Sequence, residues 1–152
     1  MKIAAYTDSG IQMASSRLRS FYVFQSPVWQ DHDVVFNPKF VSINSFQCLH
    51  LQKVLKPRFI LLALYARLTG KKVIYDIDDQ TNKIKYLIPL LLMVFLANTV
   101  VTDTELRKKY LYRKTRKKNI VVISDVLDIN QNDFEKKNLL RVSPRELDSK
   151  EK

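Results

Sequence analysis

The sequence predicts a single α/β domain built on a Rossmann-like parallel sheet with helices on both faces. Short apolar runs, typical of buried strands, alternate along the chain with segments of helical character. Several of these runs end in Asp, Ser or Gly, and ligand-binding loops lie at such strand ends in doubly wound sheets. A length of 152 residues suits one domain, and a hydrophobic content of 46% is enough for a core.

The first half of the chain is expected to contribute two strands and three helices. Lys2–Thr7 is an apolar run that ends at a turn signal, and Asp33–Phe36 is a β-branched run closed by Asn-Pro, so both are predicted strands. Lys39–Phe46 alternates weakly and suits either an edge strand or a loop. Capping residues and apolar spacing predict helices over Arg17–Phe24, Cys48–Leu55 and Pro57–Leu68, the last of them stopped by Gly70.

The second half continues the alternation. Predicted strands cover Val73–Tyr75, Val100–Thr102 and Asn119–Ile123. A helix opens at Asp103-Thr104-Glu105 between the last two strands. Residues 1–129 form the predicted domain, and the polar residues 130–152 are expected to be a poorly ordered tail or a continuation that breaks off.

The run Tyr86–Ala97 is almost wholly apolar and invites comparison with a membrane span. A spanning helix needs about 20 apolar residues. This run has 12 and includes Pro89. We therefore expect a buried helix, with a membrane span and a re-entrant or surface segment as the alternatives.

The residue counts exclude several kinds of site. One cysteine, Cys48, forms no intrachain disulfide and no cysteine-based zinc site, and His32 and His50 have no partners at ligand spacing. Neither a Gly-x-Gly-x-x-Gly nor a Gly-x-x-x-x-Gly-Lys-Ser/Thr motif occurs, which argues against dinucleotide and P-loop sites. The N-terminus lacks the pattern of a signal peptide, so a cytosolic chain is the default expectation.

The excess of basic residues is local. The chain has 26 Lys and Arg against 15 Asp and Glu, a net charge of +11, and residues 107–118 alone contribute eight positive charges and no negative one. With Tyr110, Leu111 and Tyr112 between them, these charges suit nucleic acid, an anionic lipid surface or a solvated helix face. The basic residues are Arg107, Lys108, Lys109, Arg113, Lys114, Arg116, Lys117 and Lys118.

Three carboxylates after a strand are the candidate catalytic residues. Asp76, Asp78 and Asp79 follow Val73–Tyr75 directly, and strand alternation places the first two on the same side. Carboxylates held close together raise one another's pKa, which suits a general base or a metal ligand. A helix N-cap cluster is the alternative.

Candidate binding residues lie in the loop after the first strand and at a later strand end. Backbone amides at a helix N-terminus beside Arg17 and Arg19 suit an anion, although ordinary capping with solvated arginines is the alternative. The substrate-binding candidates are Asp8, Ser9, Gly10, Ser15, Ser16, Arg17, Arg19 and Asp103.

Four segments in this order resemble a known family. They are Ala14–Arg19, Gly70–Asp79, Val100–Leu106 and Asn119–Asp128. Together they resemble the N-terminal domain of GT-B fold glycosyltransferases of the group 1 type, and the resemblance covers about residues 1–130. The chain departs from the family in having Gly10 alone where many members have a glycine pair. It also lacks the Pro-Asn-Gly turn after the last strand and the whole second domain.

The resemblance implies an acceptor-binding half of a nucleotide-sugar-dependent transferase, inactive without a C-terminal donor-binding domain or partner chain. It implies a truncated frame, half of a split enzyme or a relic. No metal is required, no cofactor is bound by this domain alone, and the complete enzyme would use a nucleotide-sugar donor. Because family members often work beside membranes, the resemblance favours lipid over nucleic acid for residues 107–118, and a peripheral position at the inner face of the membrane. The alternative is a non-enzymatic α/β binding module that uses residues 107–118 on an anionic membrane or nucleic acid.

Overall fold

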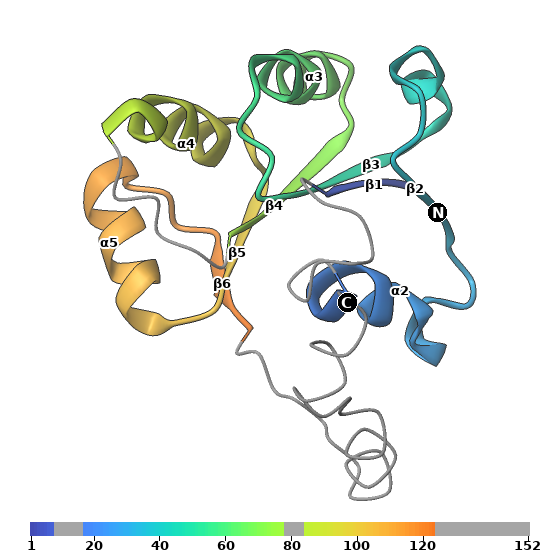
Figure 1. Ribbon diagram of the computed structural model, residues 1–152, viewed down its shortest axis with the longest axis horizontal. Helices are drawn as coiled ribbons and strands as arrows, with labels where there is room; N and C mark the ends of the chain where they lie inside the picture. Colours follow the sequence, from blue (N-terminus) through green and yellow to red (C-terminus); the bar gives the residue numbers. More distant parts are fainter. Residues whose placement is uncertain (8–16, 78–83, 124–152) are drawn as a thin grey trace, which may run out of the picture.

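The computed structural model describes residues 1–7, 17–77 and 84–123, and its centre is a six-stranded sheet in which every strand is parallel to its neighbours. The strand order is β2-β1-β3-β4-β5-β6, so the Rossmann-like α/β class predicted from the sequence is confirmed (Figure 1). The strands are β1 (Lys2–Thr7), β2 (Asp33–Phe36), β3 (Cys48–Gln52), β4 (Lys72–Ile77), β5 (Thr99–Thr102) and β6 (Ile120–Val122).

Helices cover both sides of the sheet. The helices α3, α4 and α5 lie on one side, and α2 lies on the other (Figure 1). Their bounds are α2 (Tyr22–Gln25), α3 (Pro57–Leu68), α4 (Ile84–Leu96) and α5 (Glu105–Thr115). A π-helical turn, η1 (Arg17–Phe21), leads into α2, and two 3-10 turns, η2 (Pro27–Trp29) and η3 (Phe40–Ser45), flank β2.

The core lies between the central strands and the long helices. Tyr6, Leu51 and Tyr75 are register partners in neighbouring strands, so their side chains share one face of the sheet. The ring of Tyr6 meets Phe59 of α3 edge-on at 5.5 Å between centroids, which identifies this as the face under the long helices. Each of these four side chains is buried.

The prediction of a helix over Cys48–Leu55 was wrong, because Cys48–Gln52 is strand β3 in the middle of the sheet. Its apolar residues Leu49 and Leu51 face the core under the helices. His50 and Gln52 point to the opposite face, and both are buried. The strand period was hidden because two polar side chains occupy buried positions where apolar ones were expected.

The segment that was predicted as an edge strand or loop forms η3 instead. Two serines explain the turn, because the hydroxyl of Ser42 donates to the carbonyl oxygen of Lys39 at 2.7 Å, and that of Ser45 to Ser42 at 2.8 Å. The other predicted boundaries are close to those observed. Gly70, with φ of +74°, follows α3, and the Thr104 side chain caps α5 by accepting from the Arg107 amide at 3.3 Å.

The expectation of a buried helix over Tyr86–Ala97 was only half correct. One side of α4 is buried, including Met93 and Val94, whereas Ile88 and Phe95 on the other side are 70% and 74% exposed. No helix in the described part of the chain combines the length and apolar character needed to cross a membrane. The apolar run therefore supplies core packing on one side and an uncovered apolar surface on the other.

Candidate functional site

Polar side chains form a row where three central strands end. Thr7 of β1, Gln52 of β3 and Asp76 of β4 are register partners, and all three are buried. The chain order of the strands reverses between β1 and β3, and parallel sheets bind ligands beside such a switch point. The predicted catalytic residue Asp76 therefore lies at the edge of the sheet where ligands bind in this class of fold.

Asp76 is held by Arg19 in a two-pronged ion pair. Arg19 Nη2 donates to Asp76 Oδ1 at 2.7 Å, and Arg19 Nε lies 3.0 and 3.1 Å from Oδ1 and Oδ2. The guanidinium also reaches the carbonyl oxygen of Ile123 at 3.4 Å. The two side chains are only 5% and 4% exposed, so the pair ties η1 to the end of β4 inside the protein.

The ion pair gives Asp76 and Arg19 a different role from the ones predicted from the sequence. Asp76 was a candidate base and Arg19 a candidate anion ligand, and the structure joins the two across 57 residues of sequence. A general base must lie within reach of its substrate. In this conformation the carboxylate is enclosed and neutralised by the guanidinium, an arrangement that suits a structural tie.

His50 lies beside the ion pair without joining it. Its Nε2 is 3.9 Å from Asp76 Oδ2, and the ring of Phe24 meets the imidazole edge-on at 5.1 Å between centroids. Burial, and then the charge of Arg19, lowers the pKa of His50 from 6.5 to about 4. The imidazole is therefore neutral at pH 7, and the contact with Asp76 is not an ion pair there.

Replacement of His50 is expected to flatten the loss of stability in acid. The unfolded state binds more protons than the folded state between pH 6.5 and about 4, so the free energy of unfolding falls as pH drops through this window. The fall attributable to His50 is about 1.4 kcal/mol per pH unit at most, absent above the window and complete below it. Urea unfolding of wild type and His50→Leu at pH 7 and pH 4.5 measures this fall. Equal losses of stability in the two proteins would contradict the assignment of the acid sensitivity to His50.

Several predicted site residues lie outside the described part of the chain. They are Asp8, Ser9, Gly10, Ser15, Ser16, Asp78 and Asp79. Arg17 begins η1. Asp103 follows β5 and accepts from Arg107, four residues later at the start of α5, which gives it a local partner.

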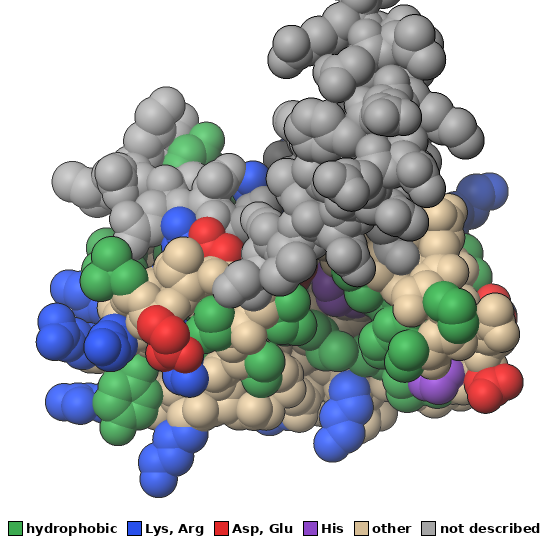
Figure 2. All heavy atoms as spheres, turned by 90° about the horizontal axis from the view of Figure 1, so that it is seen from below, with side chains coloured by type: hydrophobic (Ala, Val, Ile, Leu, Met, Phe, Trp, Pro, Cys, Tyr) green, Lys and Arg blue, Asp and Glu red, His purple; other side chains and the backbone are tan. Residues whose placement is uncertain are grey.

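The basic segment, residues 107–118, covers α5 and the turn that follows it. Its exposed cations are Lys109, Arg113, Lys114, Arg116 and Lys118. Figure 2 shows Lys and Arg side chains gathered at the end of the molecule where α5 lies. Arg107 is paired with Asp103, and Lys108 Nζ lies 3.3 Å from Glu105 Oε1. Apart from Lys117, the segment therefore divides into exposed charges and charges with local acidic partners.

Lys117 has a different position from its neighbours. Its ammonium group donates to the carbonyl oxygen of Ala97 and lies 3.5 Å from that of Phe95, at the end of α4. Burial, and then the charge of Arg67, lowers the pKa of Lys117. Because the last carbonyls of a helix lack partners within the helix, Lys117 acts as a cap for α4.

Lys117→Met is expected to lower the free energy of unfolding by about 1.5 to 3 kcal/mol, the value of a hydrogen bond from a charged donor. The matched variant is Lys118→Met, whose side chain is exposed and is expected to change stability by less than about 0.5 kcal/mol. Urea denaturation of both variants measures the difference. Equal stability of the two would argue against the cap.

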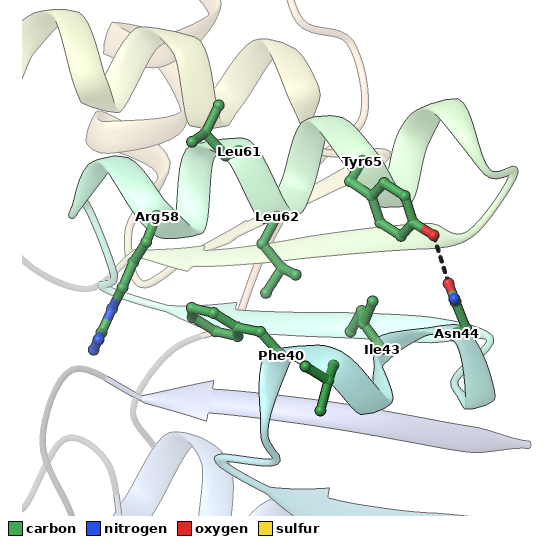
Figure 3. A pocket seen from close by; sticks show the side chains of 8 residues that line it. Phe40, Ile43, Asn44, Arg58, Leu61, Leu62 and Tyr65 are labelled. Atoms are coloured by element: carbon green, nitrogen blue, oxygen red, sulfur yellow. Dashed lines mark hydrogen bonds between the residues drawn. The ribbon is translucent and has the colours of Figure 1, made fainter.

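An open groove of about 470 Å³ lies between η3 and α3. Phe40 and Ile43 line one wall, and Leu61 and Leu62 line the other (Figure 3). The groove is closed at one end by Tyr65, whose hydroxyl donates to Asn44 Oδ1 at 2.6 Å. None of the residues predicted from the sequence as site residues lines this groove.

The guanidinium of Arg58 also lines the groove. Its central carbon lies 5.6 Å from the ring centroid of Phe40 and 4.9 Å from that of Phe59. The groove thus combines an apolar floor with one exposed cation at its rim.

In the described ranges, no three His, Cys, Asp or Glu side chains gather in a way that would hold a metal ion. Searches against protein-family models, curated proteins and solved structures found no match to this chain.

Proposed function

We propose that this chain is an α/β module that binds anionic membrane surfaces through the basic segment, residues 107–118. The observation that carries the proposal is the exposure of five cations along α5 and the turn after it. No acidic residue occurs from Leu106 to Ile123 to offset them. A basic residue near an anionic bilayer contributes about 1 kcal/mol of binding free energy, so five are enough for peripheral attachment.

The aromatic residues of the segment favour lipid over single-stranded nucleic acid. Binding by stacking needs aromatic faces that are open to bases. Tyr110 is partly buried against the core, and the guanidinium of Arg116 lies 6.0 Å from the ring centroid of Tyr112. The segment therefore presents five exposed cations but one exposed aromatic ring, that of Tyr112.

Co-sedimentation with vesicles tests this proposal. The protein is expected to bind vesicles made of equal parts phosphatidylcholine and phosphatidylglycerol, and to bind pure phosphatidylcholine far less. Replacing Lys109, Lys114 and Lys118 by Ala is expected to weaken partition on the order of a hundredfold, since about 3 kcal/mol is lost.

The matched control removes the same charge elsewhere, through Lys39→Ala, Lys136→Ala and Lys150→Ala. This triple variant is expected to keep most of the wild-type partition, because the charges that contact lipid are local. Equal weakening by the two triple variants would mean that net charge alone drives binding. An unchanged partition of the first variant would refute the role of the segment.

A second candidate is the acceptor-binding half of a GT-B glycosyltransferase. Its support is the parallel sheet with a polar row at the strand ends beside the β1–β3 switch point. The acceptor-binding half is expected to neither transfer nor hydrolyse nucleotide sugars by itself. Release of labelled sugar from UDP- or GDP-sugars at enzyme-like rates by the isolated chain would contradict the half-domain proposal.

A further inference from the structure

The outer surfaces of α3 and α4 carry an apolar face that nothing in the described structure covers. On α4, Ile88, Leu92 and Phe95 follow the i, i+4, i+7 spacing of one helix side, and all three are exposed. On α3, Leu61 and Leu68 are 65% and 78% exposed, and Leu64 lies between them. The two helices pack side by side (Figure 1). We call these six residues the α3–α4 apolar face.

The chain segments that form this face contain no acidic residue. The sequence contains no Asp or Glu from Val34 to Tyr75 or from Gln80 to Thr102, stretches that include both helices. Arg58 and Arg67 are exposed on α3 itself. An apolar surface with exposed basic residues at its rim matches the interface of an anionic bilayer, where acyl chains lie beneath negative head groups.

The apolar face is continuous with the basic segment. The ammonium group of Lys117 lies 3.5 Å from the carbonyl oxygen of Phe95, the last residue of the α4 stripe. The charge of Arg67, at the end of α3, acts on Lys117 as well. The ends of α3 and α4 thus lie close to the turn after α5, on the side of the sheet where β4, β5 and β6 begin.

We infer that the α3–α4 apolar face inserts shallowly into the interface of an anionic membrane while the adjoining basic segment contacts the head groups. This inference rests on the proposed function and adds the lipid-inserting residues and a bilayer-embedded mode of binding. A second copy of the chain is a poorer occupant, because a self-complementary interface would bring the basic rims of two copies together.

Salt separates the two contributions to binding. Head-group attraction is screened as ionic strength rises, whereas apolar insertion is not. Wild type is expected to retain partial binding to the phosphatidylglycerol vesicles in molar salt. The double variant Ile88→Ser with Phe95→Ser is expected to lose this residual binding, with partition reduced by about a hundredfold.

The matched control is Val28→Ser with Ile123→Ser, which removes two exposed apolar side chains elsewhere and is expected to bind like wild type. Thermal unfolding checks that both double variants are folded. Loss of salt-resistant binding in the α4 variant alone supports the inference. Retention of wild-type binding by the α4 variant, together with loss in the Lys109, Lys114 and Lys118 variant, overturns insertion and leaves the proposed function standing.

Two further outcomes overturn the inference. Absence of wild-type binding to anionic vesicles at any salt concentration removes the proposed function and the inference together. A dimer in light scattering that dissociates in the Ile88→Ser, Phe95→Ser variant assigns the face to contact between copies.

Discussion

Asp76→Asn is expected to lower the free energy of unfolding by about 3 to 5 kcal/mol, the usual cost of leaving one partner of a buried ion pair without its counter-charge. The substitution keeps the size of the side chain but removes the charge that balances Arg19. Both side chains are 5% exposed or less, so water cannot replace the lost partner. Urea denaturation followed by circular dichroism measures the change.

Two further variants test whether the loss of stability comes from the buried ion pair. Asp103→Asn disrupts a pair nearer the surface and is expected to cost about 1 kcal/mol or less. Arg19→Met with Asp76→Leu removes both buried charges and is expected to recover much of the stability lost in Asp76→Asn. Wild-type stability of Asp76→Asn would mean that the pair does not fasten η1 to the sheet.

Leu111→Ala is the second large expected effect, with a loss of about 2 to 4 kcal/mol in the free energy of unfolding. Leu111 is the buried residue of α5 and is 1% exposed, so its truncation leaves a cavity between the helix and the sheet. The control is Tyr112→Ala, one residue further on and 41% exposed, with an expected loss below about 1 kcal/mol. Denaturant unfolding compares the two.

Leu111→Ala also tests whether Leu111 anchors α5, the helix that carries most of the basic segment. Amide hydrogen exchange across α5 is expected to quicken in Leu111→Ala more than exchange in α3, because the lost contact anchors α5. Uniform quickening over the whole chain would show that α5 opens only when the entire domain unfolds.

Most of the fold could be predicted because its strands are short apolar runs with clear ends. Asp33–Phe36 matched the observed strand, and the Thr104 cap marked the start of α5. The central strand β3 was missed because His50 and Gln52 are polar yet buried. Their environment depends on contacts with segments distant in sequence, such as the hydrogen bond from Ser20 to Gln52, which no local pattern reports.

The charged residues of the candidate site could be predicted from the sequence, but their interaction partners could not. The basic segment was evident as a cluster, but the position of Lys117 at the end of α4 depends on how two helices pack. Arg19 and Asp76 were both singled out, although in separate roles, because the sequence shows polarity at strand ends and not which polar groups meet. The exposed side of α4 could not be predicted, because a helix that is apolar all round has no hydrophobic periodicity that distinguishes its outer face. The resemblance to GT-B glycosyltransferases stays a prediction.

Quenching of a single tryptophan by brominated lipid tests most directly whether the surface beside the basic segment enters the membrane. Trp29 is the one tryptophan of the chain, so Trp29→Phe provides a background for Phe95→Trp on α4 and, as a control, Val28→Trp beside α2. With phosphatidylglycerol vesicles brominated in the acyl chains, we expect strong quenching at position 95 and little at position 28. Absence of quenching at position 95 in vesicle-bound protein, or equal quenching at both positions, would contradict the insertion of this surface.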